Sequence, residues 1–212
     1  MVKSIVTFSV HAGQATPFEP FIRTWTKLDK ALGNIYAVVE VLSGPPIDVA
    51  DVVLDAVESS FKDNLQLSIT YYLKEAIKKS HENLRAYSAR DWRASLTLVS
   101  VQNDGFYLAN AGPTFANLYT NGSVYDVITP SQSTLGKGVS LGEDGEFITH
   151  LAYKELKEDD ILLLAWGTLG AHINDGEIRS LFQGDADNVS RNVYRLVNDE
   201  KEFAVLVMSC EK

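Results

Sequence analysis

The stretch "YAVVEVLSGPP", Tyr36 to Pro46, combines an apolar run, a single carboxylate and a tight turn. Residues 35–42 are nearly all apolar, which is typical of a short strand that is buried on both faces. Glu40 interrupts this run, and a turn containing Gly44 and two prolines follows it. Because a carboxylate beside a glycine turn is a common place for a metal ion or a substrate, the stretch predicts a core strand and a candidate site at Glu40.

Two helices are predicted after this turn. Residues 47–61 carry apolar side chains at helical spacing, with Asp48, Asp51, Asp55 and Glu58 on the remaining surface. Pro46 suits the start of a helix, where its missing N–H has no partner to lose. Residues 68–87 form a second apolar stripe that runs from Ile69 to Tyr87.

Strand patterns dominate the rest of the chain. Asn103-Asp104-Gly105 and Asn121-Gly122 predict two hairpin turns, because these residues tolerate a positive φ. The expected strands are 4–10, 35–42, 95–102, 106–111, 115–120, 124–128, 147–153, 161–165 and 203–209, with short helices at 176–182 and 189–197. Residues 11–33 give no clear prediction. This order indicates an α+β fold of mostly antiparallel sheet with helices on its outer faces.

The composition narrows the class of protein. With 212 residues, 45% hydrophobic and 22% charged, the chain fits a single globular domain over residues 1–212. The formal net charge of −9 argues against binding of nucleic acid, which depends on Lys and Arg. No apolar run is long enough to cross a membrane, so no membrane partner is expected. The single cysteine, Cys210, and the lack of a signal-like segment at the N-terminus lead us to expect a cytoplasmic location.

Several phrases resemble the PPM family of metal-dependent protein serine/threonine phosphatases, the PP2C and SpoIIE-like group. The phrase "AVVEVLSGPP" stands where the family has a strand ending in Asp-Gly before a long helix. Similar correspondences are "LANAGP" at 108–113, "ITPSQSTLGKG" at 128–138, "LKEDDILLLAWGTLG" at 156–170 and "KEFAVLVMS" at 201–209. The resemblance covers most of the chain. It implies a four-layer α-β-β-α sandwich of two mostly antiparallel sheets flanked by helices.

The resemblance also implies where two divalent ions would bind, and the residues there differ from the family pattern. Catalysis in the family needs several carboxylates around Mg²⁺ or Mn²⁺ ions that activate a water. The corresponding positions here are Glu40 for the bridging Asp, Val41 for the next Gly, Gly167 for the second Asp, and Lys201 and Glu202 for the final Asp-Asn. One ligand type, Glu40, remains, so the resemblance implies a degenerate member with no bound cofactor. If Asp199 or Glu200 corresponds to the family's final Asp instead, the position of Gly167 still lacks a carboxylate.

Each of these residues also has a structural interpretation. Glu40 either remains a single metal ligand, accepts backbone N–H bonds or pairs with a base, and Lys201 is one candidate base. Trp166 either fills part of the metal cleft, presents an apolar contact or packs in the core. The four histidines, at 11, 81, 150 and 172, lack metal-ligand spacing and suit solvated or capping roles, and Cys210 suits an inert thiol.

The expected function is that of a pseudophosphatase domain that is catalytically inactive and binds a protein partner, such as a phosphoprotein, a kinase or a regulatory factor. The alternative is an active metal-dependent phosphatase whose rearranged site uses Glu40 with Asp199 or Glu200 and Mn²⁺ or Mg²⁺. A purely structural or dimerising module is a third possibility. The acidic surface favours basic partners.

Overall fold

We describe the chain from a computed structural model, which covers residues 2–16, 19–26, 32–62, 68–102, 105–128, 140–144, 147–174 and 176–210. Within these residues, none of the helices combines the length and the apolar character that a membrane span requires.

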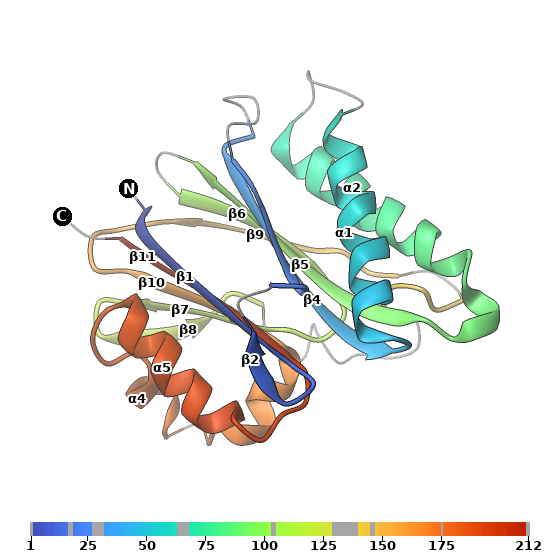
Figure 1. The fold of residues 1–212 in the computed structure, drawn as a ribbon. Helices are drawn as coiled ribbons and strands as arrows, with labels where there is room; N and C mark the ends of the chain where they lie inside the picture. The colour runs from blue at the N-terminus through green and yellow to red at the C-terminus, as the bar shows by residue number, and fades with distance from the viewer. Residues whose placement is uncertain are drawn as a thin grey trace.

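Two antiparallel sheets pack face to face in the centre of the molecule (Figure 1). The first sheet has the order β2-β1-β11-β10-β7-β8, and the second has the order β3-β4-β5-β6-β9. The strands of the first sheet are β1 (Val2–His11), β2 (Gln14–Thr16), β7 (Phe115–Thr120), β8 (Ser123–Asp126), β10 (Ile161–Ala165) and β11 (Phe203–Cys210). Those of the second are β3 (Ile22–Trp25), β4 (Asn34–Ser43), β5 (Arg93–Gln102), β6 (Gly105–Ala111) and β9 (His150–Glu155).

Helices cover the outer face of each sheet (Figure 1). On the second sheet lie α1 (Pro46–Lys62) and α2 (Ile69–Arg85), and on the first lie α4 (Ile178–Leu181) and α5 (Ala186–Val197). Two short 3₁₀ helices, η1 (Ser88–Arg90) and η2 (Gly167–His172), complete the described elements. The four-layer α-β-β-α sandwich that the resemblance implied is thereby confirmed.

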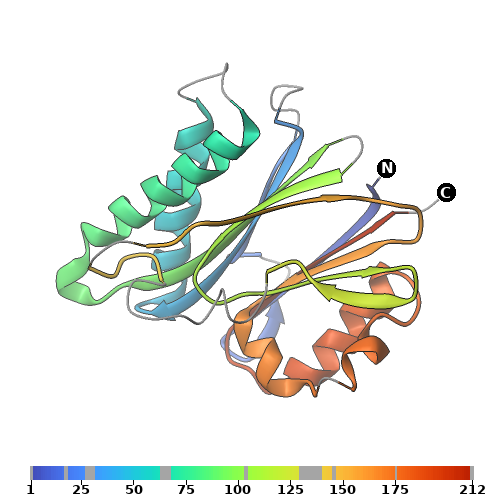
Figure 2. The same cartoon turned by 180° about the vertical axis from the view of Figure 1, so that it is seen from behind.

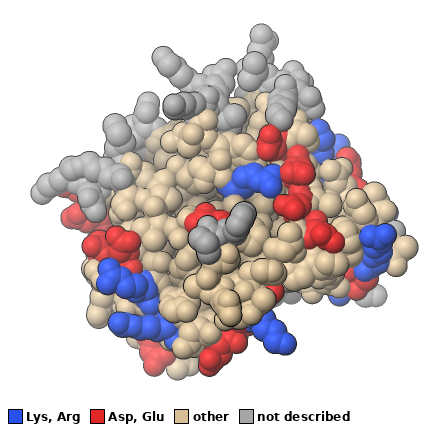
Figure 3. Space-filling view, in the orientation of Figure 1, with Lys and Arg blue, Asp and Glu red and all other residues tan. Residues whose placement is uncertain are grey.

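The amphipathic pattern of α1 explains its place in this arrangement. Its apolar side chains are buried against β4 and β5 as part of the core, as the sequence predicted. Its acidic side chains form a row on the outer surface beside a basic group (Figure 3). The basic group is Arg23 of β3, whose guanidinium lies 2.7 Å from Asp55 and 3.5 Å from Asp51.

The turn after β4 depends on Gly44. Its φ of +106° lies in the left-handed region, and a Cβ there would meet Trp92 Cδ1 and Val49 Cγ2, both at 2.8 Å. The turn therefore packs tightly between Trp92 and Val49 at the start of α1. A side chain at position 44 would displace both of these residues. Close packing therefore requires a glycine at position 44, a requirement that the sequence alone did not reveal.

Most predicted elements are confirmed within a few residues at their ends. Asn121 and Gly122 have φ values of 51° and 76°, as the predicted hairpin turn between β7 and β8 requires. The predicted turn at 103–104 and most of the connector at 134–145 lie outside the described residues. The strands β2 and β3 fall in the segment 11–33, for which the sequence gave no clear prediction. Each is short and lies at the edge of a sheet, so neither has a recognisable sequence pattern.

Candidate functional site

Glu40 lies near the end of β4, and its side chain points between the two sheets. The residue is only 4% exposed. Its Oε2 accepts a 2.7 Å hydrogen bond from the backbone N–H of Gly167, at the start of η2. The backbone of Thr168 and the side chain of Ser95, which lies opposite Glu40 on β5, also hydrogen bond to this carboxyl. One carboxyl group therefore joins the second sheet to the β10–η2 connection of the first.

Burial raises the pKa of Glu40 from its ordinary value of 4.5 to about 7. Removing the charged carboxylate from water is costly, and this effect outweighs the stabilisation of the charged form by the hydrogen bonds from Gly167, Thr168 and Ser95. The group therefore exchanges its proton near neutral pH.

Trp166 precedes Gly167 and contacts the strand that carries Glu40. Its indole Nε1 donates a 2.7 Å hydrogen bond to the carbonyl of Val39, one residue before Glu40. Its ring packs edge-on against Phe21, at 5.1 Å between centroids, and also contacts Phe203. Trp166 is 5% exposed. Among the alternatives for this residue, core packing is the one that the structure supports.

Gly167 packs closely against the 112–114 turn. A Cβ at this position would lie 3.0 Å from Pro113 Cβ and 3.1 Å from the backbone nitrogen of Thr114. A side chain at position 167 would therefore require the 112–114 turn to shift by a few tenths of an ångström. The N–H of Gly167 donates to Glu40. Val41 stands where the resemblance places a glycine. It pairs with Ala94 in the sheet and packs against the core.

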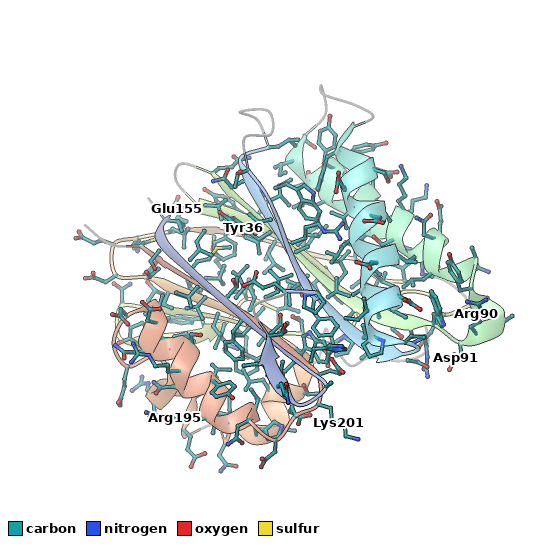
Figure 4. All side chains as sticks on the ribbon, in the orientation of Figure 1. Tyr36, Arg90, Asp91, Glu155, Arg195 and Lys201 are labelled. Carbon is teal, nitrogen blue, oxygen red and sulfur yellow. The ribbon has the colours of Figure 1, made fainter. Side chains whose placement is uncertain are left out.

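Lys201 does not pair with Glu40. Its side chain is exposed and points away from the molecule at the lower end of Figure 4, while its carbonyl accepts a 2.9 Å hydrogen bond from Gly13. Among the described residues, the partners of the Glu40 carboxyl are the two backbone groups and Ser95. The hypothesis of a Lys201–Glu40 ion pair was therefore wrong.

The carboxylates near Lys201 are engaged with histidines. Glu202 Oε2 lies 2.9 Å from Nδ1 of His11, and its other oxygen accepts a hydrogen bond from the N–H of Ala12. Glu200 Oε1 lies 2.8 Å from Nε2 of His172 in η2. These contacts tie the loop before β11 to the β1–β2 hairpin and to η2. Asp199 is exposed in the same loop.

The second sheet also holds a buried polar group at Asn110, which the sequence analysis included only as part of the phrase "LANAGP". Asn110 of β6 is fully buried, and its Nδ2 donates to Thr97 Oγ1 at 3.1 Å. The Thr97 hydroxyl in turn lies 2.9 Å from that of Thr114. The Asn110 Oδ1 has no hydrogen-bond partner among the described residues. A signal was present in the sequence, because polar residues alternate with apolar ones at 95, 97 and 110 within otherwise apolar strands.

The residues present do not fit a site for two divalent ions. Each Mg²⁺ or Mn²⁺ ion prefers about six oxygen ligands, several of them carboxylates. In the described part of the chain, no group of three or more His, Cys, Asp or Glu side chains has the geometry to hold a metal ion. Glu40 is bonded to backbone N–H groups, and Gly167 supplies no carboxylate.

Two further residues that the sequence analysis considered, His81 and Cys210, are buried. His81 is buried, its Nδ1 accepts a hydrogen bond from Gly142, and burial together with the nearby Arg85 lowers its pKa. Burial raises the pKa of the Cys210 thiol, so this residue has the environment of an inert cysteine.

Comparison with known proteins gives structural relatives only. No protein-family model and no curated protein sequence matches the chain. The serine/threonine phosphatase of S. agalactiae has a TM-score of 0.76 at 13% identity, over 98% of this chain and 100% of that one. PppA of Pseudomonas aeruginosa, described as a key regulatory component of T6SS, has a TM-score of 0.71 at 14% identity, over 98% of each chain.

A third relative was solved with metal bound. The catalytic domain of PstP, in complex with 2 manganese ions, has a TM-score of 0.70 at 14% identity, over 100% of this chain and 99% of that one. The similarity extends over the whole sandwich, whereas the identities are too low to carry over individual residues. The chain therefore has the fold of the PPM-type serine/threonine phosphatases.

Proposed function

We propose that this protein is a non-catalytic domain with the phosphatase fold, which acts by binding a protein partner. The observation that carries the proposal is the hydrogen bond from the Gly167 N–H to the Glu40 carboxylate. In this arrangement Glu40, which stands at the family's bridging metal position, links the second sheet to the start of η2. A carboxylate in that role is not available to bind an ion or to position a water.

The other residues at those positions support the same proposal. The side chain of Lys201 is exposed, and Glu202 is bonded to His11 and Ala12. Trp166 is buried, and the half-buried turn residues Pro113 and Thr114 lie close to Gly167. Restoring a metal site would require changes at several of these positions together.

The partner in this proposal is a protein with a basic surface. The chain has a formal net charge of −9, which attracts basic partners at long range and repels nucleic acid. A cytoplasmic location remains a prediction, because it rests on the sequence alone.

An active phosphatase with a rearranged site is the competing function. Two observations favour it: the structural relatives are phosphatases, one of them solved with manganese, and Glu40 has a pKa of about 7, which suits proton transfer. The site would need Glu40 together with Asp199 or Glu200. Glu200, however, already pairs with His172.

Hydrolysis of p-nitrophenyl phosphate with Mn²⁺ separates the two functions. The wild type and Glu40→Ala are compared, and the melting temperature is followed with and without metal. Our proposal predicts no turnover and no metal-dependent rise in melting temperature. Turnover that is lost in Glu40→Ala supports the competing function.

A further inference from the structure

We propose that the sandwich edge formed by β8 and β9 binds an extended segment of a partner protein that alternates bulky apolar and basic residues. This inference rests on the proposed function, because it names the surface through which a non-catalytic domain acts. The edge surface is defined by Tyr125, Ile148, Leu151, Tyr153 and the pocket between the two strands.

Both sheets end on this side of the molecule. The strand order places β8 last in one sheet and β9 last in the other. Figure 2 shows β9 and the β7–β8 hairpin in front, one from each sheet. Within the described part of the chain, neither strand has a partner on its outer side. An edge strand presents unpaired N–H and C=O groups, to which an extended chain can add as a further strand.

Large apolar side chains gather along this edge. The exposed fraction is 53% for Tyr125, 57% for Ile148, 38% for Leu151 and 47% for Tyr153. Leu151 and Tyr153 are two residues apart on β9 and therefore lie on the same face of the strand. The Tyr153 ring is held in place by Tyr107 of β6, at 4.8 Å between centroids. An added strand would find an apolar contact at alternate positions.

A pocket of about 430 Å³ opens between the two strands. Its floor includes the buried side chains of Leu118 and Val127, and Tyr125, Tyr153 and Lys154 also line it. This volume lies within the range of ordinary ligand sites, roughly 300–1,000 Å³, and admits one bulky side chain. The pocket therefore supplies side-chain specificity that the edge backbone alone lacks.

The charges around the edge indicate the kind of partner. The exposed acidic residues there are Asp126, Glu155, Glu158 and Asp159, and the exposed basic residues are Lys154 and Lys157. An acidic excess attracts Lys and Arg on the incoming segment. A second copy of this chain would bring the same acidic excess against itself, so self-association through this edge is disfavoured. The edge is also well separated from Lys201, since Figure 4 shows Glu155 at the upper left and Lys201 at the bottom of the molecule.

The experiment is selection of a phage-displayed library of random twelve-residue peptides on the intact protein, followed by synthesis of the enriched peptides. We expect enrichment of alternating apolar and Lys or Arg residues. The double variant Leu151→Lys/Tyr153→Lys should lower the affinity of these peptides by about tenfold or more. Hydrogen exchange should slow at the amides of β9 when peptide binds.

The matched control is Leu196→Lys/Tyr194→Lys on α5, whose side chains are 37% and 40% exposed. It should keep full affinity. Glu155→Lys should lower the affinity for the basic peptides several-fold. Melting temperatures show whether each variant is folded. If the β9 double variant fails to fold, Glu155→Lys and the exchange at β9 decide the outcome.

Four results would overturn the proposal: no enrichment, enrichment of acidic peptides, equal loss of affinity in both double variants, or light scattering that shows a dimer dispersed by Leu151→Lys. Each can occur while p-nitrophenyl phosphate stays uncleaved, so failure of the edge site is distinguishable from failure of the proposed function.

Discussion

The carboxylate of Glu40 and the backbone N–H of Gly167 are joined by a 2.7 Å hydrogen bond between residues 127 positions apart in the chain. This bond links β4 of the second sheet to the start of η2, which follows β10 of the first sheet. Because the carboxylate is buried and also bonded to Thr168 and Ser95, the contact acts as a cap on η2. The strand end that suggested a ligand site is therefore part of the scaffold.

Substitution of Gly167 by Ala should destabilise the fold by roughly 1 kcal/mol, because the new Cβ would lie 3.0 Å from Pro113 Cβ and 3.1 Å from the Thr114 nitrogen, so the 112–114 turn must shift. Gly170→Ala is the matched control in the same 3₁₀ helix, where the nearest atom to a Cβ is Phe115 Cδ2 at 3.9 Å. Its effect should stay within about 0.5 kcal/mol. Urea denaturation measures both. Equal effects of the two substitutions would show that the 112–114 turn accommodates the added methyl group without cost.

The pH dependence of stability should carry the signature of Glu40. Since its pKa is raised from 4.5 to about 7, the folded state binds the proton more tightly than the unfolded state does. The contribution of this group to the free energy of unfolding is full below pH 4.5 and is lost as the pH rises toward 7, by about 3 kcal/mol in total.

Glu40→Gln removes this titration. The free energy of unfolding of the wild type should therefore fall relative to that of the variant between pH 4.5 and 7. Denaturation of both proteins across this range tests the expectation. Parallel curves would mean that Glu40 titrates alike in the folded and unfolded states.

Lys201 and Glu202 should differ in their effect on stability despite being neighbours. Lys201→Ala should change the free energy of unfolding by less than about 0.5 kcal/mol, since its side chain is exposed. Glu202→Ala removes contacts to His11 and Ala12 and should cost about 1 kcal/mol. Thermal or urea unfolding compares the two variants. A larger loss in the free energy of unfolding for Lys201→Ala than for Glu202→Ala would contradict this expectation and favour an ion pair between Lys201 and Glu40.

The sequence predicted the fold well where patterns are long. The stripes of α1 and α2 and the apolar runs of β5, β10 and β11 each extend over several residues, and the structure places them within a few residues of the expected ends. The strands β2 and β3 have 3 and 4 residues, too few for a period to appear.

The site could be predicted only in part. The resemblance directed attention to Glu40 and Gly167, which the structure brings together. It did not reveal that Trp166 bonds to Val39, because that contact depends on how two sheets pack rather than on any local pattern. The choice of Lys201 as a partner was wrong for the same reason: its carbonyl accepts a hydrogen bond from Gly13 of the β1–β2 turn, and its side chain is exposed.

The most direct test of the non-catalytic role is the rate of p-nitrophenyl phosphate hydrolysis by the wild-type protein with Mn²⁺, set beside that of Glu40→Ala. The bond between Glu40 and Gly167 leads us to expect no hydrolysis above buffer in either protein. Mn²⁺-dependent hydrolysis by the wild type that disappears in Glu40→Ala would contradict it.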